Sequence, residues 1–170
     1  MEYIKQLVDS LNKLDEQSIE QAADLVVTAR KVYVAGNGGS ASTAKHFALA
    51  LKWAGKEAYS LIDNVTVVTA LANDYGYENV FKKQLENTLG KDDLVIAISG
   101  SGGSENVIRS VEYANEIGAV TLGILGFNGG RLRNIVNKYI LVENHDYGQV
   151  EDIHLAICHM ITYLVKGRNQ

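Results

Sequence analysis

The chain has 170 residues, of which 46% are hydrophobic and 21% are charged, and its formal net charge is −4. This length favours a single domain over residues 1–170 with a sizeable core, and the composition is that of an ordinary globular protein. The net negative charge argues against a nucleic-acid-binding surface, which would need a basic patch. A lone cysteine, Cys158, excludes an internal disulfide framework.

No stretch of the sequence approaches the 18 consecutive apolar residues that a membrane-spanning helix needs. The first five residues lack the apolar core of a signal peptide. We therefore expect a cytoplasmic protein with no membrane partner.

Two helices are predicted before the first strand. Apolar residues at positions 4, 7, 8, 11 and 14 have helical spacing, which predicts a helix over residues 2–14. Residues 18–21 have the form of a capping box and predict the start of a second helix, which runs to about Arg30. We expect residues 1–30 to form a helical hairpin that covers the sheet or packs against another subunit.

Five short apolar runs then alternate with helical patterns. The predicted strands are residues 32–35, 57–61, 94–98, 120–125 and 139–142. The predicted helices are residues 41–53, 65–72, 77–88, 104–117, 131–136 and 148–166, with a break at 73–76. Apolar strands that alternate with helices are typical of a parallel sheet covered on both faces, so we predict an α/β fold, a three-layer α-β-α sandwich with a five-stranded parallel sheet.

Two loops rich in glycine and serine follow predicted strands. Residues 99–104 consist of three serines and three glycines and directly precede a helix, whose free N–H groups and dipole favour an anion such as phosphate. Residues 36–40 form a similar loop, which lacks the full glycine fingerprint of a dinucleotide site. Ligands of parallel sheets bind beyond the carboxyl ends of the strands, so both loops are candidates for one anion site. The alternative is a flexible polar connection.

Histidines and one glutamate are the candidates for chemistry. Glu151 and His159 lie eight residues apart in the last predicted helix and can share a broad face, whereas His154 and His159 point in different directions. Each histidine alone is more typical of a hydrogen-bonded structural residue. If His46 converges with Glu151 and His159, the three could bind zinc or supply acid–base chemistry. We interpret Tyr77, like its neighbour at 75, as a packing residue.

Several blocks of the sequence carry a family resemblance. Residues 34–48, 72–77, 98–108, 126–130 and 150–159 resemble, in order, the signature segments of phosphoheptose isomerases, which belong to the sugar isomerase (SIS) domain superfamily. The blocks extend over nearly the whole chain. The resemblance implies the flavodoxin-like SIS fold and a homotetramer with active sites at subunit interfaces, often with zinc as cofactor.

The resemblance also implies an activity and a set of site residues. The family converts sedoheptulose 7-phosphate to D-glycero-D-manno-heptose 7-phosphate, an aldose–ketose isomerisation that supplies heptose for bacterial surface polysaccharides such as lipopolysaccharide. By resemblance, the substrate and its phosphate are bound by Asn37, Gly38, Ser40, Asp74, Ser99, Ser101 and Ser104. His46, Glu151 and His159 match metal-ligand positions, and His159 also matches a catalytic position.

The sequence departs from the family pattern at five positions. The catalytic glutamate of the family is replaced by Ala50, and a metal-binding glutamine by Glu151. An arginine, an aspartate and a threonine are replaced by Ala54, Gly148 and Gly100. Either Glu151 supplies the missing carboxylate, with His159 as its partner in acid–base catalysis, or the chain binds a phosphosugar or a protein without catalysis. The second alternative resembles the non-enzymatic scaffold that associates with the bacterial replication initiator.

Overall fold

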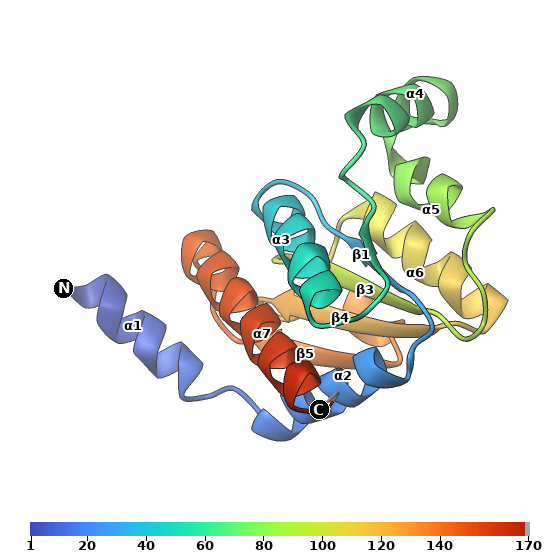
Figure 1. Cartoon of the computed structure of the whole chain (residues 1–170). Coiled ribbons are helices and arrows are strands. Elements are labelled where there is room, and N and C mark those ends of the chain that lie inside the picture. Colours follow the sequence, from blue (N-terminus) through green and yellow to red (C-terminus); the bar gives the residue numbers. More distant parts are fainter. Residues whose placement is uncertain (169–170) are drawn as a thin grey trace.

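The apolar runs of the sequence form one parallel sheet in the computed structural model, which describes residues 1–168 (Figure 1). The strands are β1 (Val32–Ala35), β2 (Ala58–Ser60), β3 (Leu94–Ser99), β4 (Val120–Gly126) and β5 (Lys138–Val142). Their order in the sheet is β2-β1-β3-β4-β5, and every neighbouring pair is parallel. The chain reverses its direction of winding between β1 and β3, and the carboxyl ends of these two strands flank a crevice where ligands bind in such sheets.

Helices cover both faces of this sheet, as predicted. The helical elements are α1 (Glu2–Leu11), α2 (Glu16–Thr28), α3 (Gly39–Trp53), α4 (Val65–Tyr75), the 3-10 turn η1 (Tyr77–Asn79), α5 (Val80–Leu85), α6 (Glu105–Ile117), the 3-10 turn η2 (Leu132–Asn134) and α7 (Tyr147–Arg168). Alternate residues of β1 enter different cores: Val32 and Val34 pack with α2, α3 and α7, whereas Tyr33 and Ala35 pack with α5 and α6. The three-layer sandwich follows from this alternation.

The start of α2 corrects one prediction. The helix begins at Glu16, two residues before the predicted capping box, and its N-cap is Asp15. The Asp15 carboxylate accepts hydrogen bonds from the Gln17 amide and from the Ser18 hydroxyl. Ser18 therefore lies inside the helix, because Asp15 already caps the N-terminus of α2.

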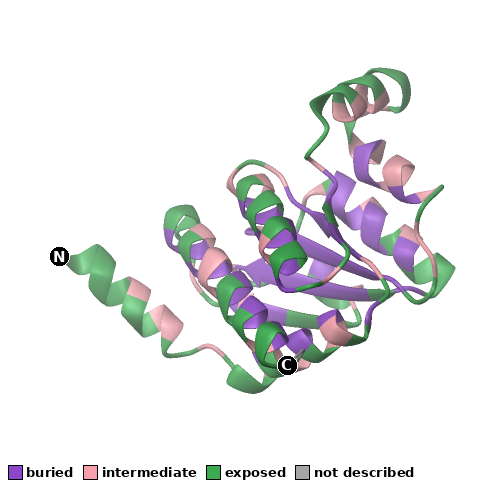
Figure 2. Cartoon of the chain, viewed as in Figure 1, coloured by how far each residue is buried: buried purple, intermediate pink, exposed green. Residues whose placement is uncertain are grey.

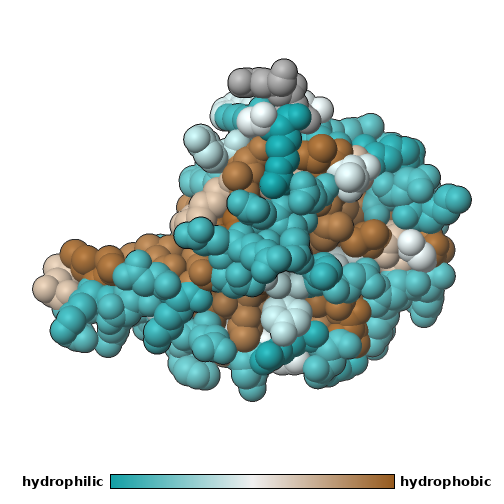
Figure 3. Space-filling model, turned by 90° about the horizontal axis from the view of Figure 1, so that it is seen from below, coloured by the Kyte–Doolittle hydropathy of each residue, from teal (hydrophilic) through white to brown (hydrophobic). Residues whose placement is uncertain are grey.

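The first two helices have different surroundings. α2 buries Ile19, Ala22, Ala23 and Val26 in the core, whereas α1 buries none of its residues. α1 projects from the body (Figures 1 and 2), and Figure 3 shows a row of hydrophobic side chains along it. Polar contacts hold it near α7: Tyr3 donates to Asp152, and Gln149 donates to Gln6. Thus α2 covers the sheet, while α1 packs only partly on the core, through Leu7 and Leu11, and leaves Ile4 and Val8 exposed.

A second projecting element is α4. The helix extends to Tyr75, into the predicted break at 73–76, and its C-cap is Gly76, whose φ of 83° suits glycine. The next predicted helix, 77–88, consists of η1 followed by the shorter α5. None of the residues of α4 is buried, although the helix is mostly apolar. Among residues 1–168, no helix has both the length and the apolar character needed to cross a membrane.

Candidate active site

A pocket of about 230 Å³ lies where β1 and β3 end. Its walls come from the first loop (residues 36–40), the phosphate loop (residues 99–104) and the start of α7. The lining residues are Asn37, Gly38, Gly39, Ser40, Ile98, Ser99, Gly100, Ser101, Ser104, Tyr147 and Glu151. All the predicted substrate-binding residues except Asp74 line it. The N-termini of α3 and α6 meet at this pocket, so their free amides and dipoles favour an anion there.

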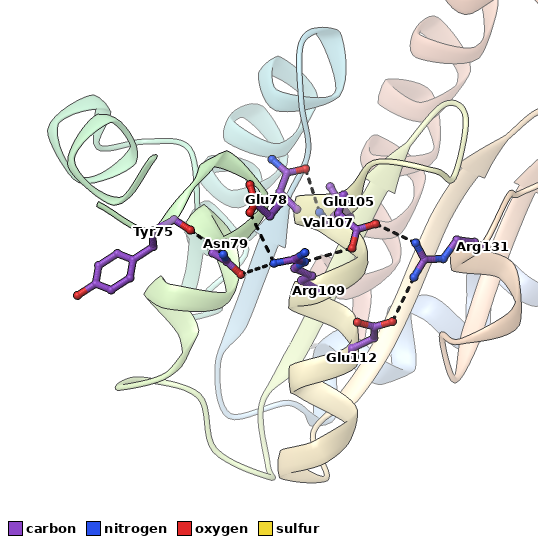
Figure 4. Close-up of polar contacts among 9 residues, drawn as sticks. Tyr75, Glu78, Asn79, Glu105, Val107, Arg109, Glu112 and Arg131 are labelled. Atoms are coloured by element: carbon purple, nitrogen blue, oxygen red, sulfur yellow. Dashed lines mark hydrogen bonds and ion pairs between the residues drawn. The ribbon is translucent and has the colours of Figure 1, made fainter. Parts of the chain in front are cut away.

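The phosphate loop is held by a support loop, residues 126–130. A Cβ atom at Gly102, where φ is 65°, would lie 1.9 Å from the carbonyl oxygen of Gly129, and one at Gly130 would lie 2.5 Å from that of Ser101. The two loops therefore meet backbone to backbone, which only glycine permits. Arg131 adds ion pairs from the end of the support loop to Glu105 and Glu112 of α6 (Figure 4).

The serines of the phosphate loop are oriented to donate. The Ser99 hydroxyl accepts from the Gly102 amide at 3.1 Å, and the Ser101 hydroxyl accepts from the Gly103 amide at 3.3 Å. A hydroxyl that accepts in this way still has its proton to donate. Ser104 is the N-cap of α6 but makes no side-chain cap hydrogen bond. These three hydroxyls can all donate to the oxygens of a phosphate group.

Glu151 reaches the pocket across a glycine of the first loop. A Cβ atom at Gly39 would lie 2.2 Å from the Glu151 carboxylate, so this close approach depends on glycine. Gly38, with φ of 56°, is the N-cap of α3. Ser40 is 6% exposed in the first turn of that helix. A carboxylate and a phosphate loop therefore share one pocket.

Two residues beside Asn37 were not predicted. The carboxamides of Asn37 and Asn106 form a reciprocal pair, and the Tyr77 hydroxyl donates to Asn37. The interpretation of Tyr77 as a packing residue was wrong, because its ring is 52% exposed and its hydroxyl reaches the first loop. No pattern in the sequence indicates a contact between positions 40 residues apart.

Asp74 lies apart from the pocket. It is exposed near the end of α4, where it accepts a hydrogen bond from the neighbouring Asn73. Tyr147, in contrast, covers the phosphate loop: a Cβ atom at Gly100 would lie 3.2 Å from its ring. The glycine that replaces the threonine of the family thus makes room for this ring.

His46 and His159 meet on the outer surface of α3 and α7. Their Nε2 atoms are 2.8 Å apart, and both residues are exposed. The three positions that the family resemblance assigns to a metal do not converge within residues 1–168, where no group of three histidine, cysteine, aspartate or glutamate residues could hold a metal. Glu151 and His159 are eight positions apart, which separates them by about 12 Å along the helix axis. A catalytic zinc needs three protein ligands, and one chain supplies two.

The inner face of α7 carries two inert groups. His154 is fully buried, and burial lowers its pKa to about 4, opposed by a weaker contact with the Leu125 backbone. Burial likewise raises the pKa of the Cys158 thiol far above its usual range. His154 and His159 therefore point in different directions, as the sequence predicted, and Cys158 is a structural thiol.

Comparisons with known proteins identify similar chains. Residues 1–126 match the profile of the SIS domain family. The chain is 35% identical over 166 residues to a phosphoheptose isomerase of Helicobacter pylori strain P12, covering 94% of this chain and 86% of that protein. It is 37% identical over 155 residues to a phosphoheptose isomerase of Geobacter sulfurreducens, covering 88% and 82%.

A solved structure shows the same fold. The phosphoheptose isomerase of Neisseria gonorrhoeae superposes with a TM-score of 0.91 at 28% sequence identity, covering 98% of this chain and 94% of that one. The predicted sandwich and its five-stranded parallel sheet are thus confirmed by both the structure and this neighbour.

Proposed function

This chain belongs to the phosphoheptose isomerase family of SIS-domain proteins, and from that premise we propose that it isomerises sedoheptulose 7-phosphate to D-glycero-D-manno-heptose 7-phosphate. The observation that carries the proposal is the pocket, where the phosphate loop and the Glu151 carboxylate face the same cavity. The product would supply heptose for bacterial surface polysaccharides, and the reaction would take place in the cytoplasm.

The serines and the helix N-termini bind the phosphate end of the substrate. Ser99, Ser101 and Ser104 donate to its oxygens, and the amides of α3 and α6 add favourable electrostatics. This binding leaves the other end of the sugar free to contact the first loop. Asn37 and Ser40 are then the sugar-binding residues, and Asp74 joins them only by a movement of α4 or from another copy of the chain.

Glu151 acts as the general base in this proposal. Isomerisation removes a proton from C1 of the ketose, passes through an enediol and returns a proton to C2, while a proton moves between the two oxygens. Ala50 cannot perform these transfers, whereas the Glu151 carboxylate lies in the pocket and can. Its position against Gly39 limits its freedom, which favours one productive orientation.

The proposed site has a second polar centre, formed by His46 on α3 and His159 on α7. We place His159 as the acid–base partner of Glu151 from another copy of the chain, and both imidazoles as zinc ligands. Because one chain does not complete such a centre, the remaining groups come from another subunit of a homotetramer. The exposed apolar surfaces of α1 and α4 support assembly. Light scattering of the purified protein tests the tetramer. A zinc titration that compares His46→Ala with the unmodified chain tests the metal.

Turnover of sedoheptulose 7-phosphate, followed by NMR, tests the activity. We expect Glu151→Gln to lower kcat by roughly 10²- to 10⁴-fold, the range for loss of a general acid–base group, while the affinity for substrate is retained. Asp152→Asn is the matched control, because this neighbouring carboxylate contacts Tyr3 and lies outside the pocket. Equal activity of Glu151→Gln and the unmodified chain would refute the role of Glu151.

A non-catalytic phosphosugar-binding or scaffold module is the second candidate. Ala50 favours it, since this partly exposed position on α3 carries no acid–base group. Binding of the sugar phosphate without turnover in the assembled protein would establish the binding module. Absence of any phosphosugar binding would instead favour the scaffold.

A further inference from the structure

Three side chains from separate elements form a polar network at the rim of the pocket. The Asn37 Nδ2 group donates to Asn106 Oδ1 at 2.7 Å, and Asn106 Nδ2 donates back to Asn37 Oδ1 at 3.0 Å. The Tyr77 hydroxyl donates to the same Asn37 Oδ1 at 2.9 Å. Asn106 is 3% exposed, so its carboxamide has little access to water. The network connects the first loop with α6 and η1.

A backbone amide fixes the direction of every hydrogen bond in this network. The Val107 N–H donates to Asn106 Oδ1 at 3.0 Å, and a backbone amide can only donate. Asn106 must therefore present its Nδ2 group to Asn37 Oδ1. With Tyr77 as a second donor, both lone pairs of Asn37 Oδ1 are used. One N–H of Asn37 remains, on a residue that lines the pocket.

We propose that Asn106 and Tyr77 are positioning residues that hold Asn37 as a hydrogen-bond donor to an acceptor oxygen of the bound ligand. The identity of the ligand, a sugar phosphate, rests on the proposed function. A reversed carboxamide would direct its carbonyl oxygen at the ligand and would repel a phosphate or carbonyl oxygen. The network therefore selects for ligands that offer an acceptor at this point.

The segment that carries Tyr77 is itself fixed to α6. Arg109 donates to Asn79 Oδ1 at 2.9 Å and to Glu105 at 3.1 Å, which joins η1 to the first turn of α6 (Figure 4). Asn79 in turn donates to the Tyr75 carbonyl at 2.7 Å, at the end of α4. The Arg109 hydrogen bond lowers the pKa of the Glu105 carboxyl, so the pair stays charged at neutral pH. Tyr77 therefore lies on a segment that α6 holds in place, and its hydroxyl contacts Asn37 from there.

Calorimetric binding of sedoheptulose 7-phosphate and of inorganic phosphate tests the inference. We expect Tyr77→Phe to weaken sugar-phosphate binding by roughly threefold to tenfold, the range for one net hydrogen bond. Tyr75→Phe is the matched control, because its ring contacts Lys83 and its hydroxyl has no hydrogen-bond partner among residues 1–168. In an Asn37→Ala background, Tyr77→Phe should have no further effect, since it acts through Asn37.

Each outcome decides a separate question. An unchanged affinity of Tyr77→Phe, or the same loss with and without Asn37, would overturn the inference, as would an unmodified chain that binds neither compound. If inorganic phosphate is weakened equally, the acceptor belongs to the phosphate; if only the sugar phosphate is weakened, it belongs to the sugar. Binding without turnover would refute the isomerase function and leave this inference standing.

Discussion

The pocket and the histidine pair use the same two helices but are built differently. At the start of α7, Glu151 enters a pocket whose walls are backbone, glycine and serine. Two turns later, His159 meets His46 on an exposed surface. The same two helices carry large apolar side chains that are each at least 37% exposed: Leu49, Trp53, Met160 and Tyr163.

The difference separates what one chain can do alone from what needs a partner. The phosphate-binding part of the pocket lies within one chain, because the phosphate loop and the support loop meet through tight backbone contacts. The histidine pair has two ligating nitrogens on helices that also expose large apolar side chains. We therefore expect phosphate binding to be a property of the single chain and the chemistry at His159 to depend on assembly. Four substitutions test this separation.

The largest effect is expected from Gly102→Ala. A Cβ atom there meets the Gly129 carbonyl oxygen at 1.9 Å in a backbone with φ of 65°, so strain and overpacking should lower the free energy of unfolding by about 3 kcal/mol. Gly118→Ala is the matched control: its φ is 82°, but nothing lies within 4 Å. Urea denaturation measures both. Equal losses would show that the two loops do not constrain each other.

The next effect concerns pH and the buried His154. Its folded pKa of about 4 lies below the ordinary value of 6.5, so the unfolded chain binds a proton that the folded chain does not. The stabilising contribution of neutral His154 to the free energy of unfolding is therefore fully present above pH 6.5. It is lost as the pH falls towards 4, by about 3 kcal/mol in total. Urea midpoints between pH 7 and 4.5 should fall less steeply for His154→Met. A slope shared by His154→Met and the unmodified chain would contradict the assignment.

A smaller effect is expected from Gly39→Ala, which acts on activity. The new methyl group would displace the Glu151 carboxylate, and a misplacement of this size can cost roughly a hundredfold in kcat. Thermal stability should change little, because the displaced atoms are the end of a flexible side chain. Glu151→Asp in the same background should recover part of the activity, since the shorter side chain leaves room. Full activity of Gly39→Ala would place the base elsewhere.

The smallest effect is expected from His46→Ala measured on phosphate binding. The imidazole lies outside the pocket, so the Kd for inorganic phosphate should stay within about twofold. Calorimetry at fixed salt measures it. A substantial loss of phosphate affinity would show that the two regions are coupled within one chain.

The sequence predicted the sheet, the helices on both faces and the two glycine-serine loops, because each depends on local periodicity or on residue types with special backbone freedom. It also placed residues 36–40 and 99–104 at one site through the shared edge of parallel strands, but it grouped Glu151 with His46 and His159 and not with the phosphate loop. It could not predict the contact of Tyr77 with Asn37, or the separation of Asp74 from the pocket, because both depend on how α4 and η1 sit on the sheet. The N-cap at Asp15 was missed because residues 18–21 match the capping-box pattern, which indicated a later start of the helix.

The seam between the phosphate loop and the support loop also matters for protein engineering. Gly102 and Gly130 each lie against the backbone of the opposite loop, and the Leu132 amide donates to the Gly102 carbonyl across the same seam. The two segments therefore constrain each other's backbone. A designer who grafts this anion site onto another scaffold must therefore transplant residues 99–104 and 126–132 as one discontinuous unit.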